Sequence, residues 1–133
     1  MAYFGKFFSV DRSEGYEDFI KALGLPEEAT AKFIAYKPKT KIEKNGDTYK
    51  ITTESQAGTR VVEFKSGVEF EERFQPEIPV KAVYTVEGDT ITQVISKDDR
   101  QATFKREYTA DTLTVTITAN FWDGKAVRYY KAE

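Results

Sequence analysis

The sequence predicts an all-β fold, an antiparallel β-barrel of about ten strands with a cap of two short helices. Three observations lead to this prediction. Turn signals recur at short intervals after residue 38, the segments between them are rich in Val, Ile, Thr, Tyr and Phe, and one region alone carries apolar residues at helical spacing. With 133 residues the chain is long enough for one domain, which is expected to span residues 1–133.

The helical region lies near the start of the chain. Four apolar residues recur at helical spacing behind Ser13, namely Tyr16, Phe19, Ile20 and Leu23. Gly24 ends this first helix, and Pro26 stands where a second helix would begin, with Lys37-Pro38 as its stop. Helices of about nine to eleven residues are not stable alone in water, so both are expected to pack on the rim of the sheet.

The turn signals divide the rest of the chain into pieces of hairpin size. Asn45-Gly46, between Ile42 and Tyr49, predicts a type I′ turn because both central positions of that turn need positive φ. A sheet of this length leaves exposed edges unless it closes, which favours a barrel. The clearest predicted strands are Thr48–Glu54, Val80–Val86, Thr90–Ser96, Ala102–Tyr108, Leu113–Asn120 and Lys125–Lys131.

Composition narrows the chemistry and the location. The chain has no Cys and no His, which excludes disulfides, Cys or His metal sites and Ser-His-Asp triads, and neither a cofactor nor a metal is expected. A net charge of -2 argues against nucleic acid as a partner. No long apolar run or cleavage signal is present, so a cytoplasmic protein is expected, and a monomer.

Arginines in two of the predicted strands are out of place in an apolar interior. Arg106 shares a strand face with Phe104 and Tyr108, whereas for Arg128 and Tyr130 alternation does not decide which face points inward. If all three polar groups point inward, they need an anion, and a ligand carboxylate matches the two-pronged guanidinium. The alternatives are that Arg106 pairs with a protein acid such as Glu72 or with water, and that Arg128 faces solvent.

Short motifs along the whole chain resemble those of the intracellular lipid-binding proteins, and most closely the insect fatty acid-binding proteins. The matching stretches occur in order and at matching intervals. They are Phe4-Gly5-Lys6, residues 13–24, Lys37-Pro38, residues 42–47, Thr53-Glu54-Ser55, residues 67–72, Phe104-Lys105-Arg106-Glu107 and residues 128–132.

The resemblance implies a lipocalin-like, ten-stranded antiparallel up-and-down β-barrel, with a helix-turn-helix lid between the first two strands and a cavity for a long-chain fatty acid. It implies that Arg128 and Tyr130, with Arg106, point inward and hold the ligand carboxylate, which favours an acid over an alcohol. Retinoic acid or another hydrophobic acid is the alternative ligand. The sequence departs from the family at Ala57 and Ile78, and the family's roles there are not carried over.

Candidate contacts for the ligand's tail come from the lid and from the ninth strand. For each of them alone, a plain place in the core is the simpler interpretation. They are Tyr16, Phe19, Ile20, Phe33, Val115 and Ile117.

The basic residues around the lid are more typical of an ordinary solvated face, and transient contact with anionic membranes is the alternative function of that face. They are Lys21, Lys32, Lys37, Lys39 and Lys41. A carrier rather than an enzyme is expected. The competing functions are an enzyme that uses Glu69, Glu71 and Glu72 as acid and base, and a protein-interaction barrel filled by its own side chains.

Overall fold

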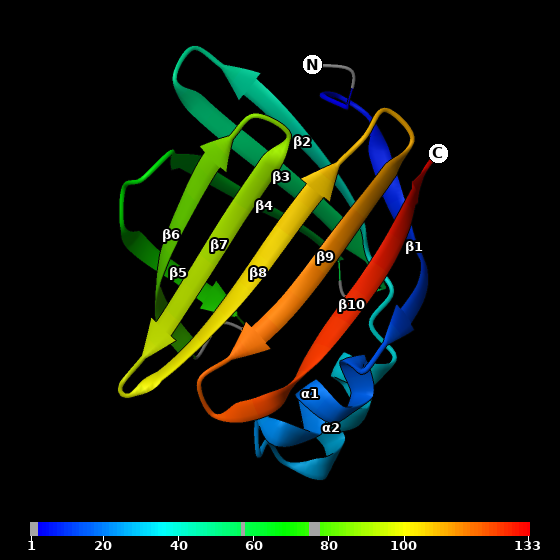
Figure 1. Ribbon diagram of the computed structural model, residues 1–133, viewed down its shortest axis with the longest axis vertical. Coiled ribbons are helices and arrows are strands. Elements are labelled where there is room, and N and C mark those ends of the chain that lie inside the picture. The colour runs from blue at the N-terminus through cyan, green and yellow to red at the C-terminus, as the bar shows by residue number, and fades with distance from the viewer. Residues whose placement is uncertain (1–2, 57, 75–77) are drawn as a thin grey trace.

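The computed structural model describes residues 3–56, 58–74 and 78–133 and shows a nearly closed β-barrel with two helices across one end (Figure 1). The predicted fold class is therefore confirmed. Ala57 lies outside the described residues, as does the side chain of Ile78. The elements are β1 (Phe7–Glu14), α1 (Tyr16–Ala22), α2 (Glu27–Ile34), β2 (Lys39–Asn45), β3 (Thr48–Ser55), β4 (Gly58–Lys65), β5 (Phe70–Phe74), β6 (Ile78–Glu87), β7 (Thr90–Lys97), β8 (Arg100–Tyr108), β9 (Thr112–Ala119) and β10 (Trp122–Ala132).

The ten strands form one antiparallel sheet in the order β4-β3-β2-β1-β10-β9-β8-β7-β6-β5. The two ends of the chain meet in this sheet, since Phe8 of β1 lies opposite Ala132 of β10. Among the described residues no hydrogen-bonded ladder joins β4 to β5. We call the gap between these two strands the seam, and it leaves the barrel open along one line.

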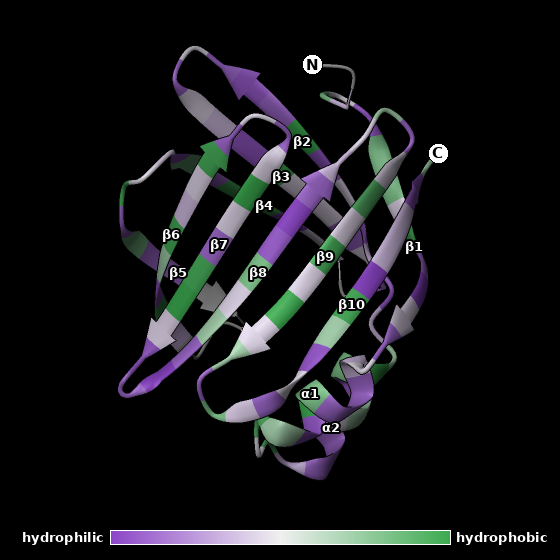
Figure 2. Ribbon diagram, viewed as in Figure 1, coloured by the Kyte–Doolittle hydropathy of each residue, from purple (hydrophilic) through white to green (hydrophobic). Residues whose placement is uncertain are grey.

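Alternate residues of each strand point into the barrel, and the hydropathy of the strands changes in bands along their length (Figure 2). The end of the barrel opposite the helices is filled with aromatic rings. Tyr3 stacks on Tyr108 with ring centroids 4.3 Å apart, and Phe8 meets Tyr108 edge-on at 5.6 Å. The Tyr3 hydroxyl donates to the Gly88 carbonyl at 3.2 Å. This end is therefore closed by core packing, whereas the other end is covered by the helices.

The lid, residues 16–34, rests on the rim of the sheet as predicted. Phe19 and Ile20 of α1 are buried, and the Phe19 ring contacts those of Phe104, Phe121 and Trp122 at 5.5–6.4 Å. No residue of α2 is fully buried. None of the helices in the described ranges combines the length and the apolar character needed to cross a membrane.

The start of the lid differs from the prediction. Ser13 belongs to β1, the N-cap position is Gly15, and the helices have 7 and 8 residues. The strand continues to Glu14 because Ser13 and Glu14 pair with Arg128 and Val127 of β10. Ladder pairing thus extends the strand over residues whose types alone favour a helix start.

The predicted turn at Asn45-Gly46 is displaced by one residue. Asn45 is the last residue of β2 and pairs with Thr48, so the two-residue loop is Gly46-Asp47. Gly46 has φ 64°, whereas Asn45 and Asp47 are not among the residues with positive φ. A single left-handed glycine at the first central position is the requirement of a type II′ turn, so the type I′ prediction was wrong.

Candidate carboxylate-binding site

The arginines predicted to meet inside the barrel lie in one row across three strands. Arg106 of β8 and Arg128 of β10 both pair with Val115 of β9. Directly opposite residues in antiparallel strands project from the same face of a sheet. Since neighbouring strands are spaced by about 4.8 Å, the two arginine backbones lie roughly 10 Å apart, and both side chains project from the inner face.

Arg128 is buried, with 5% of its surface exposed, which rules out the alternative that it faces solvent. Its Nε donates to the Ser13 hydroxyl at 2.9 Å, and its Nη2 donates to the Tyr36 carbonyl at 2.7 Å. The guanidinium carbon lies 3.9 Å from the centre of the Tyr16 ring. These partners are all neutral, so they orient the positive charge of Arg128 without cancelling it.

Arg106 has a buried nitrogen, Nη1, that makes no hydrogen bond within the described part of the chain. Its guanidinium carbon lies 5.8 Å from the centre of the Tyr84 ring. A buried donor without a partner is costly, most of all when it carries charge. The Arg106 guanidinium therefore has a vacant position for an acceptor, and a carboxylate oxygen fits it.

Tyr130 lies one inward position beyond Arg128 on β10 and is 8% exposed. Burial raises the pKa of Tyr130, while the Arg128 and Arg106 guanidinium groups oppose this rise. Burial likewise raises the pKa of Tyr16 to about 12 against the effect of Arg128. Both phenols therefore stay protonated at neutral pH and can donate a hydrogen bond to an anion beside the arginines.

The six predicted tail contacts are distributed over the lid and β9. Val115 lies between the two arginines, and Ile117 lies one inward position away, between Phe104 and Ala126. Tyr16 covers Arg128, Phe19 and Ile20 of α1 are buried, and Phe33 of α2 is half-buried. Val115 and Ile117 thus belong to the barrel wall, and the other four residues belong to the lid. Their contact with a ligand stays a prediction.

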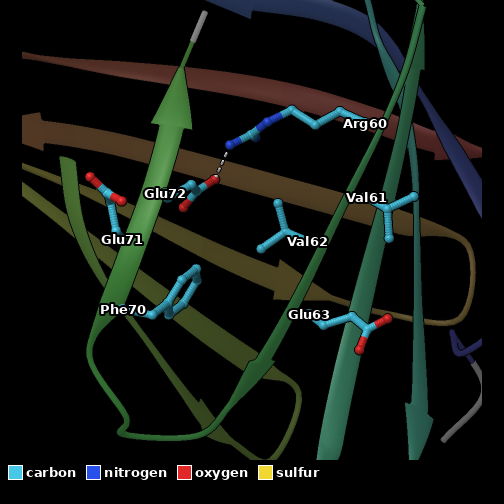
Figure 3. Close-up of a pocket in the computed structure, with 7 residues that line it drawn as sticks. All are labelled: Arg60, Val61, Val62, Glu63, Phe70, Glu71 and Glu72. Atoms are coloured by element: carbon cyan, nitrogen blue, oxygen red, sulfur yellow. Dashed lines mark hydrogen bonds and ion pairs between the residues drawn. The ribbon is translucent and has the colours of Figure 1, made fainter. Parts of the chain in front are cut away.

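Glu72 does not pair with Arg106, contrary to one of the alternatives weighed above. The buried Glu72 carboxylate is held by Arg60 Nη2 at 2.5 Å, by the Tyr84 hydroxyl at 2.9 and 3.1 Å, and by Gln93 Nε2 at 3.2 Å. Figure 3 shows Arg60 reaching from β4 across the seam to Glu72 on β5. This network beside Arg106 engages both carboxylate oxygens of Glu72.

Hollows open on the barrel next to these groups. One of about 370 Å³ lies at the seam, where Arg60, Phe70 and Glu72 line it (Figure 3). Another of about 400 Å³ lies between β1 and the lid and is lined by Ser13, Tyr16 and Arg128 among others. The Arg128 end of the site is thus close to a surface opening beside the lid.

The sequence interpretation missed several polar residues that the fold brings to the site. Ser13 and Tyr36 hold Arg128, and Arg60, Tyr84 and Gln93 hold Glu72. Strand alternation could have found two of them, since Arg60 alternates with Val62 and Phe64, and Gln93 lies between Ile91 and Ile95. Ser13 and the Tyr36 carbonyl gave no such signal.

Comparison with known proteins gives the following matches. Residues 5–133 match the family described as lipocalin / cytosolic fatty-acid binding protein. The chain is 48% identical over 132 residues to fatty acid-binding protein 1 of Manduca sexta, covering 99% of this chain and 100% of that one.

Solved structures agree in fold over nearly the whole chain. The fatty-acid-binding protein isolated from Manduca sexta superposes with a TM-score of 0.92 at 44% identity, covering 98% of this chain and 99% of the other. A fatty acid-binding protein from Drosophila melanogaster brain superposes with a TM-score of 0.87 at 35% identity, with the same coverage.

Proposed function

Because the chain belongs to the lipocalin / cytosolic fatty-acid binding protein family, we propose that it binds a long-chain fatty acid inside its barrel and carries it within the cytosol. The observation that carries the head-group assignment is the buried, unpartnered Nη1 of Arg106 in the same row as the buried Arg128. The fatty acid carboxylate accepts hydrogen bonds from Arg106, Arg128 and Tyr130, and its tail runs between the arginine row and the lid. The relatives named above are fatty acid-binding proteins, which supports this ligand class.

Burial of the tail supplies most of the affinity in this proposal. A sixteen-carbon acid has roughly fourteen methylene groups, and at about 0.8 kcal/mol each their transfer from water contributes on the order of 11 kcal/mol. The translational and rotational freedom that the ligand loses on binding costs several kcal/mol. The remaining free energy corresponds to a Kd between roughly micromolar and nanomolar. The arginines decide which head group is accepted.

Replacing both arginines tests the head-group assignment. In the double variant Arg106→Gln, Arg128→Gln we expect the preference for oleate over oleyl alcohol to fall by roughly tenfold or more, because charge-assisted hydrogen bonds are lost. Isothermal titration with each ligand measures the preference. The exposed Arg12→Gln variant is the control and should keep it.

Two other outcomes have distinct meanings. An unchanged preference in the double variant would show that the carboxylate binds elsewhere. If native mass spectrometry of the expressed protein and titration with oleate both find no bound lipid, the proposed function itself is wrong. Competition between oleate and retinoic acid separates a fatty acid carrier from the alternative carrier of another hydrophobic acid.

We propose binding without catalysis. The glutamates considered for acid and base chemistry do not form a pair in the barrel. Glu69 and Glu71 are exposed, whereas Glu72 is buried in its own network (Figure 3). Neighbouring residues of a strand project from opposite faces, which keeps Glu71 and Glu72 apart. Incubation with oleoyl esters should therefore release no product.

We also propose that a monomer makes transient contact with anionic membranes through the lid. Lys21 and Lys32 lie on α1 and α2, each beside a glutamate one turn earlier at 3.4 and 3.9 Å, and Lys37 is exposed. Exposed ion pairs of this kind are weak, so lipid phosphates can replace the glutamates. The variant Lys32→Gln, Lys37→Gln should transfer oleate to phosphatidylserine vesicles more slowly than the unaltered protein. Equal rates would argue against the contact.

A further inference from the structure

Glu72 is a buried acid that could have paired with Arg106, but it pairs with Arg60 instead. Its side chain is 2% exposed, whereas that of Arg60 is 39% exposed. A buried carboxylate requires a positive or hydrogen-bonding partner, whereas a partly exposed arginine is solvated without one. The ion pair therefore matters more to Glu72 than to Arg60.

One phenol connects this acid to the vacant guanidinium. The Tyr84 hydroxyl donates to both oxygens of Glu72, and the same Tyr84 ring lies 5.8 Å from the Arg106 guanidinium carbon. Tyr84 therefore neighbours both Glu72 and Arg106. Opposite charges that share a neighbour in a protein interior attract each other. If Arg106 is to remain available to a ligand's carboxylate, another group must hold the Glu72 carboxylate.

Arg60 is placed to do this. It projects inward from β4, and its Nη2 holds Glu72 Oε2 at 2.5 Å from across the seam (Figure 3). The remaining oxygen, Oε1, is engaged by Tyr84 and Gln93. With Arg60 in place, the charge of Glu72 is balanced, and no acid in the described part of the chain forms a salt bridge with Arg106.

We infer that Arg60 is a positioning residue for head-group recognition: by pairing with Glu72 across the seam, it keeps Arg106 free for the ligand's carboxylate. This inference rests on the proposed function and deepens it. Without Arg60, the Glu72 carboxylate competes with the ligand's carboxylate for Arg106. Selectivity for an acid over an alcohol thus depends on a residue that needs no contact with the ligand.

The test compares the oleate-to-oleyl alcohol affinity ratio in six variants by isothermal titration at neutral pH. In Arg60→Met we expect the ratio to fall roughly tenfold, since the Glu72 carboxylate has lost its partner and now competes with the ligand's carboxylate. In Arg60→Met, Glu72→Gln we expect the ratio to return to within about twofold of the starting value, because the competitor is gone. Lys65→Met, on the same strand with the same change in charge, should leave the ratio unchanged.

Each other result overturns the inference. An unchanged oleate-to-oleyl alcohol affinity ratio in Arg60→Met means that Arg60 has no effect on Arg106. A ratio as low in the double variant as in the single one means that Arg60 attracts the carboxylate directly. The fourth variant, Arg106→Gln, checks the proposed function separately: if it leaves the ratio unchanged, the head-group assignment fails before Arg60 is considered.

Removal of one member of a buried ion pair can unfold a protein, so stability is measured alongside. Glu72→Gln alone keeps an acceptor for Tyr84 and removes the buried negative charge, while its former partner Arg60 is partly exposed. This variant should keep or raise the oleate-to-oleyl alcohol affinity ratio. A tenfold lower ratio in this variant would overturn the inference even if Arg60→Met does not fold. Arg60→Lys retains the charge and should keep the ratio.

Discussion

At the residue scale, Arg128 and Arg106 have different roles in the proposed binding, because their guanidinium groups have different surroundings. Arg128 is held by the Ser13 hydroxyl, the Tyr36 carbonyl and the Tyr16 ring, so its orientation is fixed before a ligand arrives. Arg106 Nη1 is a buried donor that makes no hydrogen bond with the residues that the structure describes. A fixed charge beside a vacant donor offers a carboxylate two contacts at little cost of reorganisation.

Strand alternation predicted part of this site. It placed Arg106 on the face of Phe104 and Tyr108, and the register agrees. It left Arg128 undecided because Val127 and Tyr129 make the other face of β10 equally apolar. The partnership of Glu72 with Arg60 lay beyond prediction, since it depends on how closely two unpaired strands approach at the seam.

A single glycine permits the connection between β1 and the lid. Gly15 has φ 69°, and a Cβ atom built there would lie 2.6 Å from the Lys125 carbonyl oxygen. We expect Gly15→Ala to lower the free energy of unfolding by at least about 2 kcal/mol, from the left-handed backbone and the overlap together. Urea unfolding measures this loss.

Gly46→Ala is the matched control for that substitution. Gly46 has φ 64° but open space around the added atom. Only the backbone cost of about 1 kcal/mol should appear there. Equal losses at the two sites would show that the contact with Lys125 is relieved without cost.

At the scale of the elements, the lid is less firmly held than the strands. α2 has no fully buried residue, and α1 is anchored mainly through Phe19 and Ile20. The polar links to the barrel are few, among them Arg100 Nη1 to the Leu23 carbonyl at 3.1 Å and Gln56 Nε2 to the Ala35 carbonyl at 3.1 Å. Short helices with such support open more readily than a paired sheet.

Amide hydrogen exchange should reveal this difference. In the ligand-free protein we expect amides of residues 27–34 to exchange at least about tenfold faster than those of β8 and β9, and oleate to slow them. The β8 and β9 amides serve as the internal reference. Equal protection of lid and strands without ligand would contradict passage of the ligand through the lid.

The predicted elements agree best with the structure where the sequence follows a single hydrophobic periodicity, as it does in the strands from β6 to β10. The strands from β6 to β10 extend at most a few residues beyond their predicted limits. The beginning of the lid and the first hairpin differ because ladder pairing, which depends on partners distant in the sequence, took Ser13 and Asn45 into strands. Local residue preference carries no information about such partners.

At the scale of the whole molecule, buried tyrosines make stability depend on alkaline pH. Burial raises the pKa of Tyr108 to about 12, although Arg106 opposes this rise. The folded protein then holds a proton that the unfolded chain, with a tyrosine pKa of 10.0, releases. The contribution is complete below pH 10 and is lost as the pH rises toward 12.

Urea unfolding at pH 9, 10 and 11 checks this expectation. The loss assigned to Tyr108 is at most on the order of 3 kcal/mol, since each pKa unit corresponds to about 1.4 kcal/mol. Tyr108→Phe is the control and should flatten the decline, because Phe has no proton to lose. An equally steep decline in that variant would assign the alkaline loss to other groups, such as Tyr16.

The seam also determines how the order of strands along the chain relates to their order in space. Read from β5, the sheet runs through β6 to β10 and then from β1 to β4. A circular permutant opened between Val68 and Glu69, with residue 133 linked to residue 1, would therefore have every strand beside its neighbour in sequence. The pairing of β1 with β10, the most distant contact in the native order, would become a local hairpin. Such a permutant has a lower contact order, and faster refolding follows from that topology.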